Sequence, residues 1–272
     1  MGSAGMAAVA LGSLLVFGSS VLNQEALASG LMDLLESVSK PMPSRPQLPP
    51  LPAQPGRSKN WDGSRSHPAE LPILVMAGHA DSQGIQGSGT PGEAVGVRGA
   101  APMQAGITDE LYWTLRTAQK VVETGRKLGL NIQFYDPGVR TIVDATDPRS
   151  NWSVGARHAE QGGYAVEIHY DAYAPYGIGP GIIPGVLYGF SGIDEALAAE
   201  FGGYPYDHRG MLGAPRLGIS MLEIGRLEGA LEADLRNPSR RESTLDAIAM
   251  RVVKALQRGL ANGVMGSAQL RQ

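Results

Sequence analysis

Two short, largely apolar segments of the chain each end at a histidine, and a third ends at a glutamate. The segments cover 73–78 before His79, 164–168 before His169, and 217–222 before Glu223. Each has the composition of a buried strand whose C-terminal end is polar, and that edge of an open α/β sheet is where ligands bind. Because the chain has only five histidines in 272 residues, two at matching strand ends indicate a metal-centred hydrolytic site. Two histidines satisfied within the core are the alternative.

The composition restricts the metal chemistry open to the chain. It has no cysteine, so disulfides and thiolate metal sites are excluded, and a transition metal would have to bind His, Asp or Glu. A catalytic zinc ion typically takes three such ligands and lowers the pKa of a water molecule towards neutrality. A further glutamate can accept the proton of that water and pass it to a leaving amine. His79, a glutamate, His169 and Glu223 would supply all four roles.

Charge and motif patterns exclude several other classes of function. The formal net charge is −3 and no block of like charge occurs, so nothing indicates a nucleic-acid-binding surface. Residues 87–92 match G-x-G-x-x-G by letters, but they lie well past the strand and contain a proline, which argues against dinucleotide binding. Residues 218–222 lack the second glycine of a serine-hydrolase nucleophile elbow. Neither a Walker A sequence nor H-E-x-x-H is present.

Residues 1–28 have the outline of a secretory signal peptide. Residues 6–22 carry no charge, and Ala26-Leu27-Ala28 is a small-residue site of the kind that signal peptidase cuts. The apolar segment is also close to the minimum of about 17 residues for a spanning helix, so an uncleaved membrane anchor is an alternative; a wrongly assigned start or a buried helix is another. We therefore expect an exported protein, periplasmic or associated with the cell wall, with a membrane tether if the segment is retained.

Residues 29–70 are expected to form a short helix and a proline-rich linker. Residues 31–40 have leucine and valine at helical spacing, whereas 41–56 are too rich in proline for a helix or a central strand and favour extended polyproline II. A stiff spacer is the favoured interpretation over a PxxP ligand for an aromatic groove. Little order is expected as far as Pro68.

Residues 71–272 are expected to form one domain. The pattern predicts strands over 73–79, 131–135, 164–169, 186–190 and 217–223, and helices over 109–128, 151–161, 193–201 and 243–260. Thr108 or Asp109 would cap the first helix. Strands separated by helices predict an α/β fold, with a largely parallel or mixed sheet covered by helices on both faces.

Four short motifs, in order along this domain, resemble those of the zinc-dependent N-acetylmuramoyl-L-alanine amidases that cleave cell-wall peptidoglycan. The resemblance covers 71–260, and its motifs are Ala77-Gly78-His79, the helix start at Glu110 with the Gly129-Leu130-Asn131-Ile132 that follows, Ile168-His169-Tyr170-Asp171-Ala172, and Leu222-Glu223-Ile224-Gly225. It implies that His79, Glu110 and His169 bind zinc and that Glu223 is the general base. It also implies a sheet of about six strands and cleavage of the amide between the muramic acid lactyl group and L-alanine.

The chain also departs from the family pattern. Ala80-Asp81 replaces two glycines, and the long loop after His79 contains Glu93, a rival to Glu110 as ligand. The helix register after Glu110 fits the family and that after Glu93 does not. Glu167 replaces a small residue beside His169, and we expect its side chain to alternate to the other face of the strand.

Further residues near these motifs allow two interpretations each. Asp171 would either orient a metal-bound histidine or cap a loop. Tyr173, Tyr176 and Tyr188 would either stack on sugar or peptide or simply pack. His158 and His208 are expected at the surface or behind the site.

Two other functions fit the sequence. One is a zinc peptidase or carboxypeptidase acting on another amide, and the other is a catalytically silent peptidoglycan-binding domain tethered by the linker. The sequence leaves open the peptidoglycan specificity, any activating partner and the oligomeric state.

Overall fold

The computed structural model describes residues 59–269, with side chains as far as Ala261. The expected signal peptide or anchor at 1–28, the helix at 31–40 and the proline-rich segment at 41–56 lie outside these residues. None of the described helices combines the length and the apolar composition that crossing a bilayer requires.

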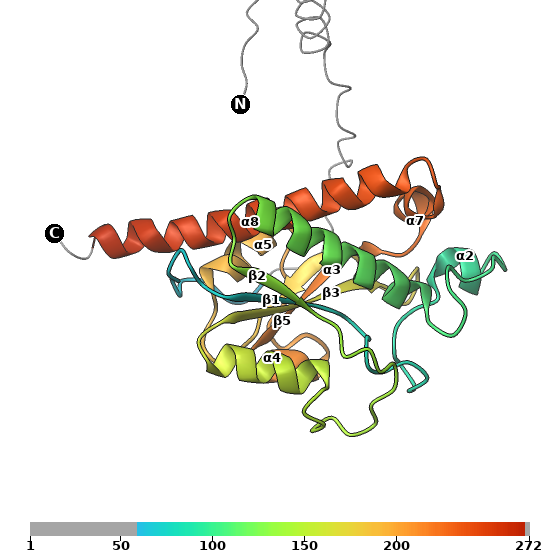
Figure 1. Ribbon diagram of the computed structural model, residues 1–272, viewed down its shortest axis with the longest axis horizontal. Helices are drawn as coiled ribbons and strands as arrows, with labels where there is room; N and C mark the ends of the chain where they lie inside the picture. Colours follow the sequence, from blue (N-terminus) through green and yellow to red (C-terminus); the bar gives the residue numbers. More distant parts are fainter. Residues whose placement is uncertain (1–58, 270–272) are drawn as a thin grey trace, which may run out of the picture. The chain divides into compact units, whose positions relative to one another are not determined.

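A five-stranded mixed sheet forms the centre of the described domain (Figure 1). In spatial order its strands are β2 (Ile132–Tyr135), β1 (Ile73–Ala77), β3 (Tyr164–Asp171), β5 (Ile219–Arg226) and β4 (Gly181–Ile183). The first four run parallel, and β4 pairs antiparallel with β5. This confirms the expected α/β fold with a mixed sheet, although the described residues contribute five strands rather than about six.

The expected strand at 186–190 is wrong. Leu187 is 55% exposed, and Gly189 has a φ of 78° and donates its N–H to the Val186 carbonyl, which closes a turn. A run of apolar residues predicted a strand there, but the glycine conformation turns the chain away from the sheet. The short buried strand β4 lies instead in the neighbouring Gly/Pro-rich segment, residues 176–185.

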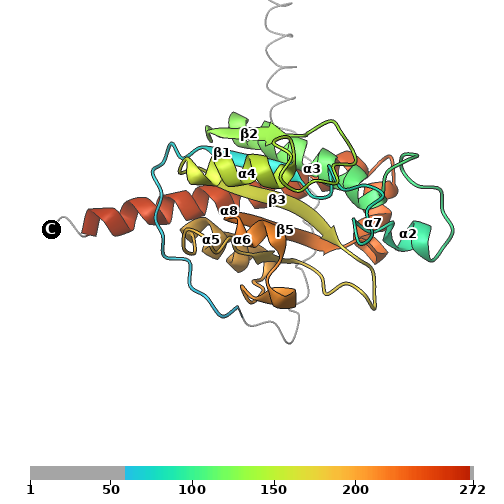
Figure 2. The same ribbon diagram turned by 90° about the horizontal axis from the view of Figure 1, so that it is seen from below.

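Helices cover both faces of the sheet, as expected. On one face lie α3 (Asp109–Lys127), α5 (Gly192–Phe201) and α8 (Arg241–Gln269), and on the other lie α4 (Asn151–Glu160) and α6 (Gly213–Arg216) (Figures 1 and 2). The larger apolar core lies between the sheet and the face covered by α3, α5 and α8. Three further elements complete the described chain: α2 (Gly92–Gly96), the 3-10 turn η1 (His208–Gly210) and α7 (Gly229–Arg236).

Short polar residues begin the helices that carry or support the site. Thr108 precedes α3, and its side chain accepts the Leu111 N–H, as a capping residue should. Ser150 caps α4 in the same way. Ser191 and Asp194 form a reciprocal capping box on α5. The Thr108 cap fixes the start of α3, whose first turn carries Glu110.

Residues 59–70 pack on the domain, so the expectation of little order as far as Pro68 is wrong for this part. Trp61 is buried and donates its indole N–H to the Tyr204 carbonyl at 2.7 Å. His67 is also buried and lies 2.7 Å from the Ser191 hydroxyl. A buried tryptophan removes a large apolar surface from water, which favours the packed position of this segment.

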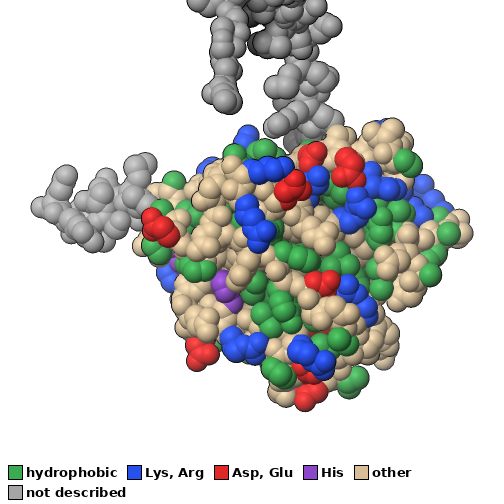
Figure 3. Space-filling view, viewed as in Figure 1, with side chains coloured by type: hydrophobic (Ala, Val, Ile, Leu, Met, Phe, Trp, Pro, Cys, Tyr) green, Lys and Arg blue, Asp and Glu red, His purple; other side chains and the backbone are tan. Residues whose placement is uncertain are grey.

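Charged side chains of both signs are interspersed on the face shown in Figure 3. This arrangement agrees with the small net charge of −3. It gives no support to a nucleic-acid-binding surface, which needs positive charge gathered on one face.

Candidate metal centre

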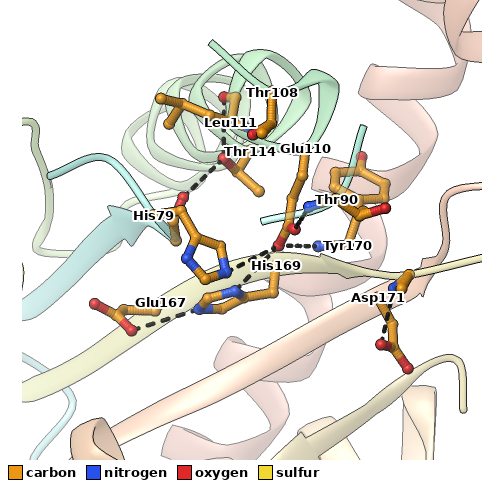
Figure 4. Close-up of polar contacts among 12 residues, drawn as sticks. His79, Thr90, Thr108, Glu110, Leu111, Thr114, Glu167, His169, Tyr170 and Asp171 are labelled. Atoms are coloured by element: carbon orange, nitrogen blue, oxygen red, sulfur yellow. Dashed lines mark hydrogen bonds and ion pairs between the residues drawn. The ribbon is translucent and has the colours of Figure 1, made fainter. Parts of the chain in front are cut away.

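Two histidines and a glutamate from three separate elements converge at the carboxyl edge of the sheet (Figure 4). His79 follows β1, His169 lies near the end of β3, and Glu110 occupies the first turn of α3. Glu110 Oε1 lies 3.2 Å from His169 Nδ1 and 3.6 Å from His79 Nε2. One ligand atom of each residue lies within 4.8 Å of the others. The three predicted ligands are thus brought together, as the positions of the strand ends suggested.

The backbone at His79 is in an unusual conformation. Its φ is 61°, in the left-handed region that non-glycine residues rarely adopt. Such a conformation costs about 1–3 kcal/mol and persists where surrounding contacts impose it. Here Gln83 supplies them: its amide donates to the His79 carbonyl at 3.0 Å and accepts the Thr108 N–H at 2.8 Å. Gln83 therefore ties the histidine-bearing turn to the start of the helix that carries Glu110.

Gly78 is required beside the second histidine. A Cβ at this position would overlap the Cε1, Nδ1 and Nε2 atoms of the His169 ring. The Gly78 N–H also donates to the Ile168 carbonyl at 2.8 Å, so the backbone has little room to retreat. The absence of a side chain at residue 78 leaves room for the imidazole of His169 directly after the end of β1.

We expect Gly78→Ala to weaken zinc binding at least about tenfold, because the displaced His169 ring would lose its geometry as a ligand. Competition with a chromogenic chelator measures the affinity. Gly192→Ala is the matched control, since a Cβ there meets nothing closer than ordinary contact distance. Unchanged zinc affinity in a folded Gly78→Ala protein would contradict this role.

The long loop after His79 holds Glu110 in place. The Thr90 N–H donates to Glu110 Oε2 at 2.8 Å, and the Glu110 N–H donates to the Thr90 carbonyl at 3.1 Å. The Tyr170 N–H lies 3.4 Å from Oε1. Glu110 is 4% exposed, so these contacts fix a carboxylate that faces both histidines.

The charges of the site favour a bound cation. Burial by itself would raise the pKa of Glu110, but the adjacent histidines and the Thr90 N–H lower it overall. Burial lowers the pKa of His79. It would do the same to His169, but hydrogen bonds to Glu110 and Glu167 and the Glu223 charge raise the pKa of that histidine well above its usual range. Without a metal, a proton on His169 therefore supplies the positive charge that these carboxylates attract.

Glu223 lies on β5, the strand next to β3, at the position that pairs with His169 in the strand register. Its Oε2 atom is buried and has no hydrogen-bond partner within the described residues. Burial is the main cause that raises the pKa of Glu223 to about 8; the charges of His169 and Arg209 oppose this rise, and those of Glu110 and Asp171 add to it. A buried carboxylate oxygen without a partner, beside a cluster of ligands, is suited to accept a proton.

We expect Glu223→Gln to remove part of the pH dependence of stability in the metal-free protein. Between the ordinary pKa of 4.5 and about 8, the folded chain holds a proton that the unfolded chain releases. The free energy of unfolding therefore falls as the pH rises through this window. Glutamine does not titrate. Between about pH 5 and about pH 9, the free energy of unfolding should therefore fall by at least about 1 kcal/mol less in the variant than in wild type. Urea unfolding of both metal-free proteins measures the difference, and equal losses would contradict the shift.

The donor set and its spacing fit zinc. Two histidines and one carboxylate are a common set for a catalytic zinc ion. Two ligands of a tetrahedral zinc ion, each about 2.1 Å from the metal, lie about 3.4 Å apart. Glu110 Oε1 lies at comparable distances from the two histidines, 3.2 Å from His169 Nδ1 and 3.6 Å from His79 Nε2. His79 Nδ1 lies 3.3 Å from the Ser82 hydroxyl, which leaves Nε2 facing Glu110. The residues present therefore fit the ion.

Glu93, the rival ligand, lies elsewhere. Its carboxylate pairs with Arg98 at 2.8 Å and accepts the Gly229 N–H at 3.1 Å, at the start of α7. The structure thus groups Glu110, and not Glu93, with the histidines among the described residues.

The residues that the sequence left open divide by their place in the fold. Asp171 accepts the N–H groups of Ala172, Ile178 and Gly179 and points away from the histidines, so it caps the loop after β3 (Figure 4). Tyr173 and Tyr176 follow it at the carboxyl edge, with ring centroids 5.8 Å apart. The remaining residues lie outside the ligand group: Tyr188 beside Gly218, His158 beside Pro72, and His208 against Tyr204.

The expectation that Glu167 points to the other face of β3 is wrong. Glu167 Oε2 lies 3.4 Å from His169 Nε2, and Glu167 is 3% exposed. Residues two apart on a strand share a face, because side chains alternate with a period of two. Counting that period from His169 would have placed Glu167 correctly.

Sequence patterns also missed the two residues that hold the ligands. Gln83 and Thr90 lie in the loop after His79, where no periodicity operates. Thr90 acts through its backbone, which leaves no trace in the residue type. Gln83 is only 5% exposed, and this burial is visible only in the folded chain.

Comparisons with known proteins give structural matches only. No protein-family model matches the chain, and no curated protein does. The matching solved structures include three amidases. AmiC2 of Nostoc punctiforme is an N-acetylmuramoyl-L-alanine amidase with 16% identity and a TM-score of 0.41, over 70% of this chain and 99% of its own. The catalytic domain of CwlV, an N-acetylmuramoyl-L-alanine amidase of Bacillus (Paenibacillus) polymyxa var. colistinus, has 15% identity and a TM-score of 0.42, over 73% of this chain and 99% of that domain. Ami1 of Mycobacterium abscessus, an N-acetylmuramyl-L-alanine amidase, has 19% identity and a TM-score of 0.42, over 68% of this chain and 98% of its own.

Proposed function

We propose that this chain is a zinc-dependent hydrolase that cleaves the amide between N-acetylmuramic acid and L-alanine in cell-wall peptidoglycan. The observation that carries the proposal is the convergence of His79, Glu110 and His169 beside Glu223, whose Oε2 atom is buried without a hydrogen-bond partner among the described residues. Such a group of two histidines and two carboxylates, three to hold a metal and one to move a proton, suits amide hydrolysis.

The chain's own residues divide the work. His79, Glu110 and His169 would hold the zinc ion, which, when bound, polarises a carbonyl and lowers the pKa of water. Glu223 would take the proton from the attacking water and deliver it to the departing L-alanine nitrogen. Its raised pKa, about 8, is suited to both tasks, because a group that titrates near neutral pH can both accept and release a proton. The positive charge of a bound ion would lower this pKa towards neutrality.

The choice of peptidoglycan as substrate rests on the four motifs that resemble the amidase family. The proposal extends to residues 1–28, which would direct export or tether the domain to a membrane, and to residues 29–70, which would space it from that end. The substrate would then be met in the periplasm or the cell wall.

Insoluble peptidoglycan provides the test. The full-length zinc-loaded protein should release soluble peptides that begin with a free L-alanine amino group, detected by amino-group labelling and mass spectrometry. Removal of the metal with a chelator should stop release, and added zinc should restore it. Release of free amino acids or of peptides with another N-terminus would instead identify a peptidase. Binding to the wall without any product, by zinc-loaded protein, would identify a silent binding domain.

A further inference from the structure

Glu167 places a second buried carboxylate beside His169, at the ring nitrogen that does not face Glu110. It lies in β3, whose residues at this level pair with Met76 on β1 and Met221 on β5, so the middle of the sheet fixes its backbone. Glu167 is 3% exposed, and its side chain makes one hydrogen bond within the described residues, to His169 Nε2 at 3.4 Å. A carboxylate this deeply buried is costly unless the groups around it use its charge.

The two ring nitrogens of His169 face two different carboxylates. Nδ1 lies 3.2 Å from Glu110, and Nε2 lies 3.4 Å from Glu167, on the other side of the ring (Figure 4). Glu167 is accordingly not part of the ligand group formed by His79, Glu110 and His169. A neutral imidazole has one N–H and one lone pair, so an N–H directed at Glu167 leaves the lone pair of Nδ1 directed at the cation.

We propose that Glu167 is a positioning residue that accepts the Nε2–H of His169 and so fixes Nδ1 as the atom that binds the metal. The inference rests on the zinc site of the proposed function. Metal-bound histidines commonly donate their second N–H to a carboxylate, which fixes the ring and makes it a stronger ligand. In this chain the acceptor comes from the same strand, two residues before the ligand, and it stands where the amidase motif has a small residue.

A neighbouring carboxylate, Asp81, separates the direct hydrogen bond from general negative charge. Asp81 lies close enough to both His79 and Glu167 for their charges to interact. Its Oδ2 accepts the Asn151 N–H at 2.7 Å and does not contact His169. Asp81→Asn is therefore a matched control that removes one negative charge near the site and leaves the Glu167–His169 contact in place.

The experiment measures the zinc dissociation constant of the full-length protein by chelator competition. Glu167→Met, which keeps the length of the side chain but replaces the carboxylate with a thioether that accepts hydrogen bonds only weakly, should bind zinc about 10–100-fold more weakly than wild type. Glu167→Gln, whose amide oxygen still accepts, should recover most of the affinity, and Asp81→Asn should stay within about threefold of wild type. A merely structural role for Glu167 would not produce this rescue by glutamine.

Nitrogen NMR of the zinc-loaded protein gives a second readout, which also serves if Glu167→Met fails to fold. Wild type should show His169 protonated at Nε2 with Nδ1 bound to metal, and Glu167→Gln should show a weaker hydrogen bond at Nε2. Wild-type affinity in a folded Glu167→Met protein, or zinc on Nε2 of His169 in wild type, would overturn the role of Glu167 and leave the proposed function standing. A wild-type chain that binds no zinc would overturn both.

Discussion

Glu223→Gln is expected to retain zinc and to lose turnover on peptidoglycan by about a hundred- to ten-thousand-fold, the range that general acid–base catalysis contributes. Glutamine has nearly the same shape but cannot accept the proton of the attacking water. Glu223 is not one of the three grouped ligands, so the metal should stay. Zinc content and the rate of L-alanine N-terminus release, measured on the same preparation, check both halves.

The matched control for this loss is Glu242→Gln. Glu242 is an exposed residue of α8 that pairs with Arg116, so its removal should leave the rate within about twofold, as surface pairs contribute little. Turnover near the wild-type rate in Glu223→Gln would remove Glu223 from the mechanism. Loss of zinc in that variant would instead make it a ligand.

His169→Ala is expected to abolish both zinc binding and activity. His169 is 3% exposed and faces Glu110 at 3.2 Å, so its loss removes one of three ligands and leaves buried carboxylates without their cationic partner. Wild type should carry about one zinc ion per chain and the variant close to none, measured by elemental analysis.

Glu93→Gln is the control that separates the two candidate glutamates. Glu93 pairs with Arg98 and Gly229, away from the histidines, so its loss should leave the zinc content unchanged. Glu110→Gln, in contrast, should lose zinc as His169→Ala does. Loss of zinc in Glu93→Gln with retention in Glu110→Gln would reverse the assignment.

The parts of the fold that follow a strict period could be predicted from the sequence. The sequence offers Thr108 or Asp109 as the cap of α3, and the structure has Thr108 there. The apolar segments before His79, His169 and Glu223 predict the strands β1, β3 and β5. Because parallel strands align their carboxyl ends, the convergence of these residues follows from topology alone. Glu110 was placed with them by the resemblance to the amidases and by its position at the head of a helix.

The features that the sequence did not reveal depend on contacts between distant segments. The packing of Trp61 against Tyr204, and the positioning of Glu110 by the backbone of Thr90, leave no periodic pattern. The turn at Gly189 interrupted a segment whose residue types favour a strand. Glu167 is different, since the period of two on β3 alone places its side chain on the same face as His169.

The most direct test of zinc-dependent amide hydrolysis at the lactyl group is digestion of peptidoglycan in heavy-oxygen water, followed by mass spectrometry of the products. Hydrolysis of the muramyl–alanine amide places the oxygen of water on the carbonyl carbon of the lactyl group. We expect one heavy oxygen in the carboxylate of the N-acetylmuramic acid product and none in the released peptide. Label in the carboxylate of a peptide or of a free amino acid would show that another amide is cut, and would contradict the proposed function.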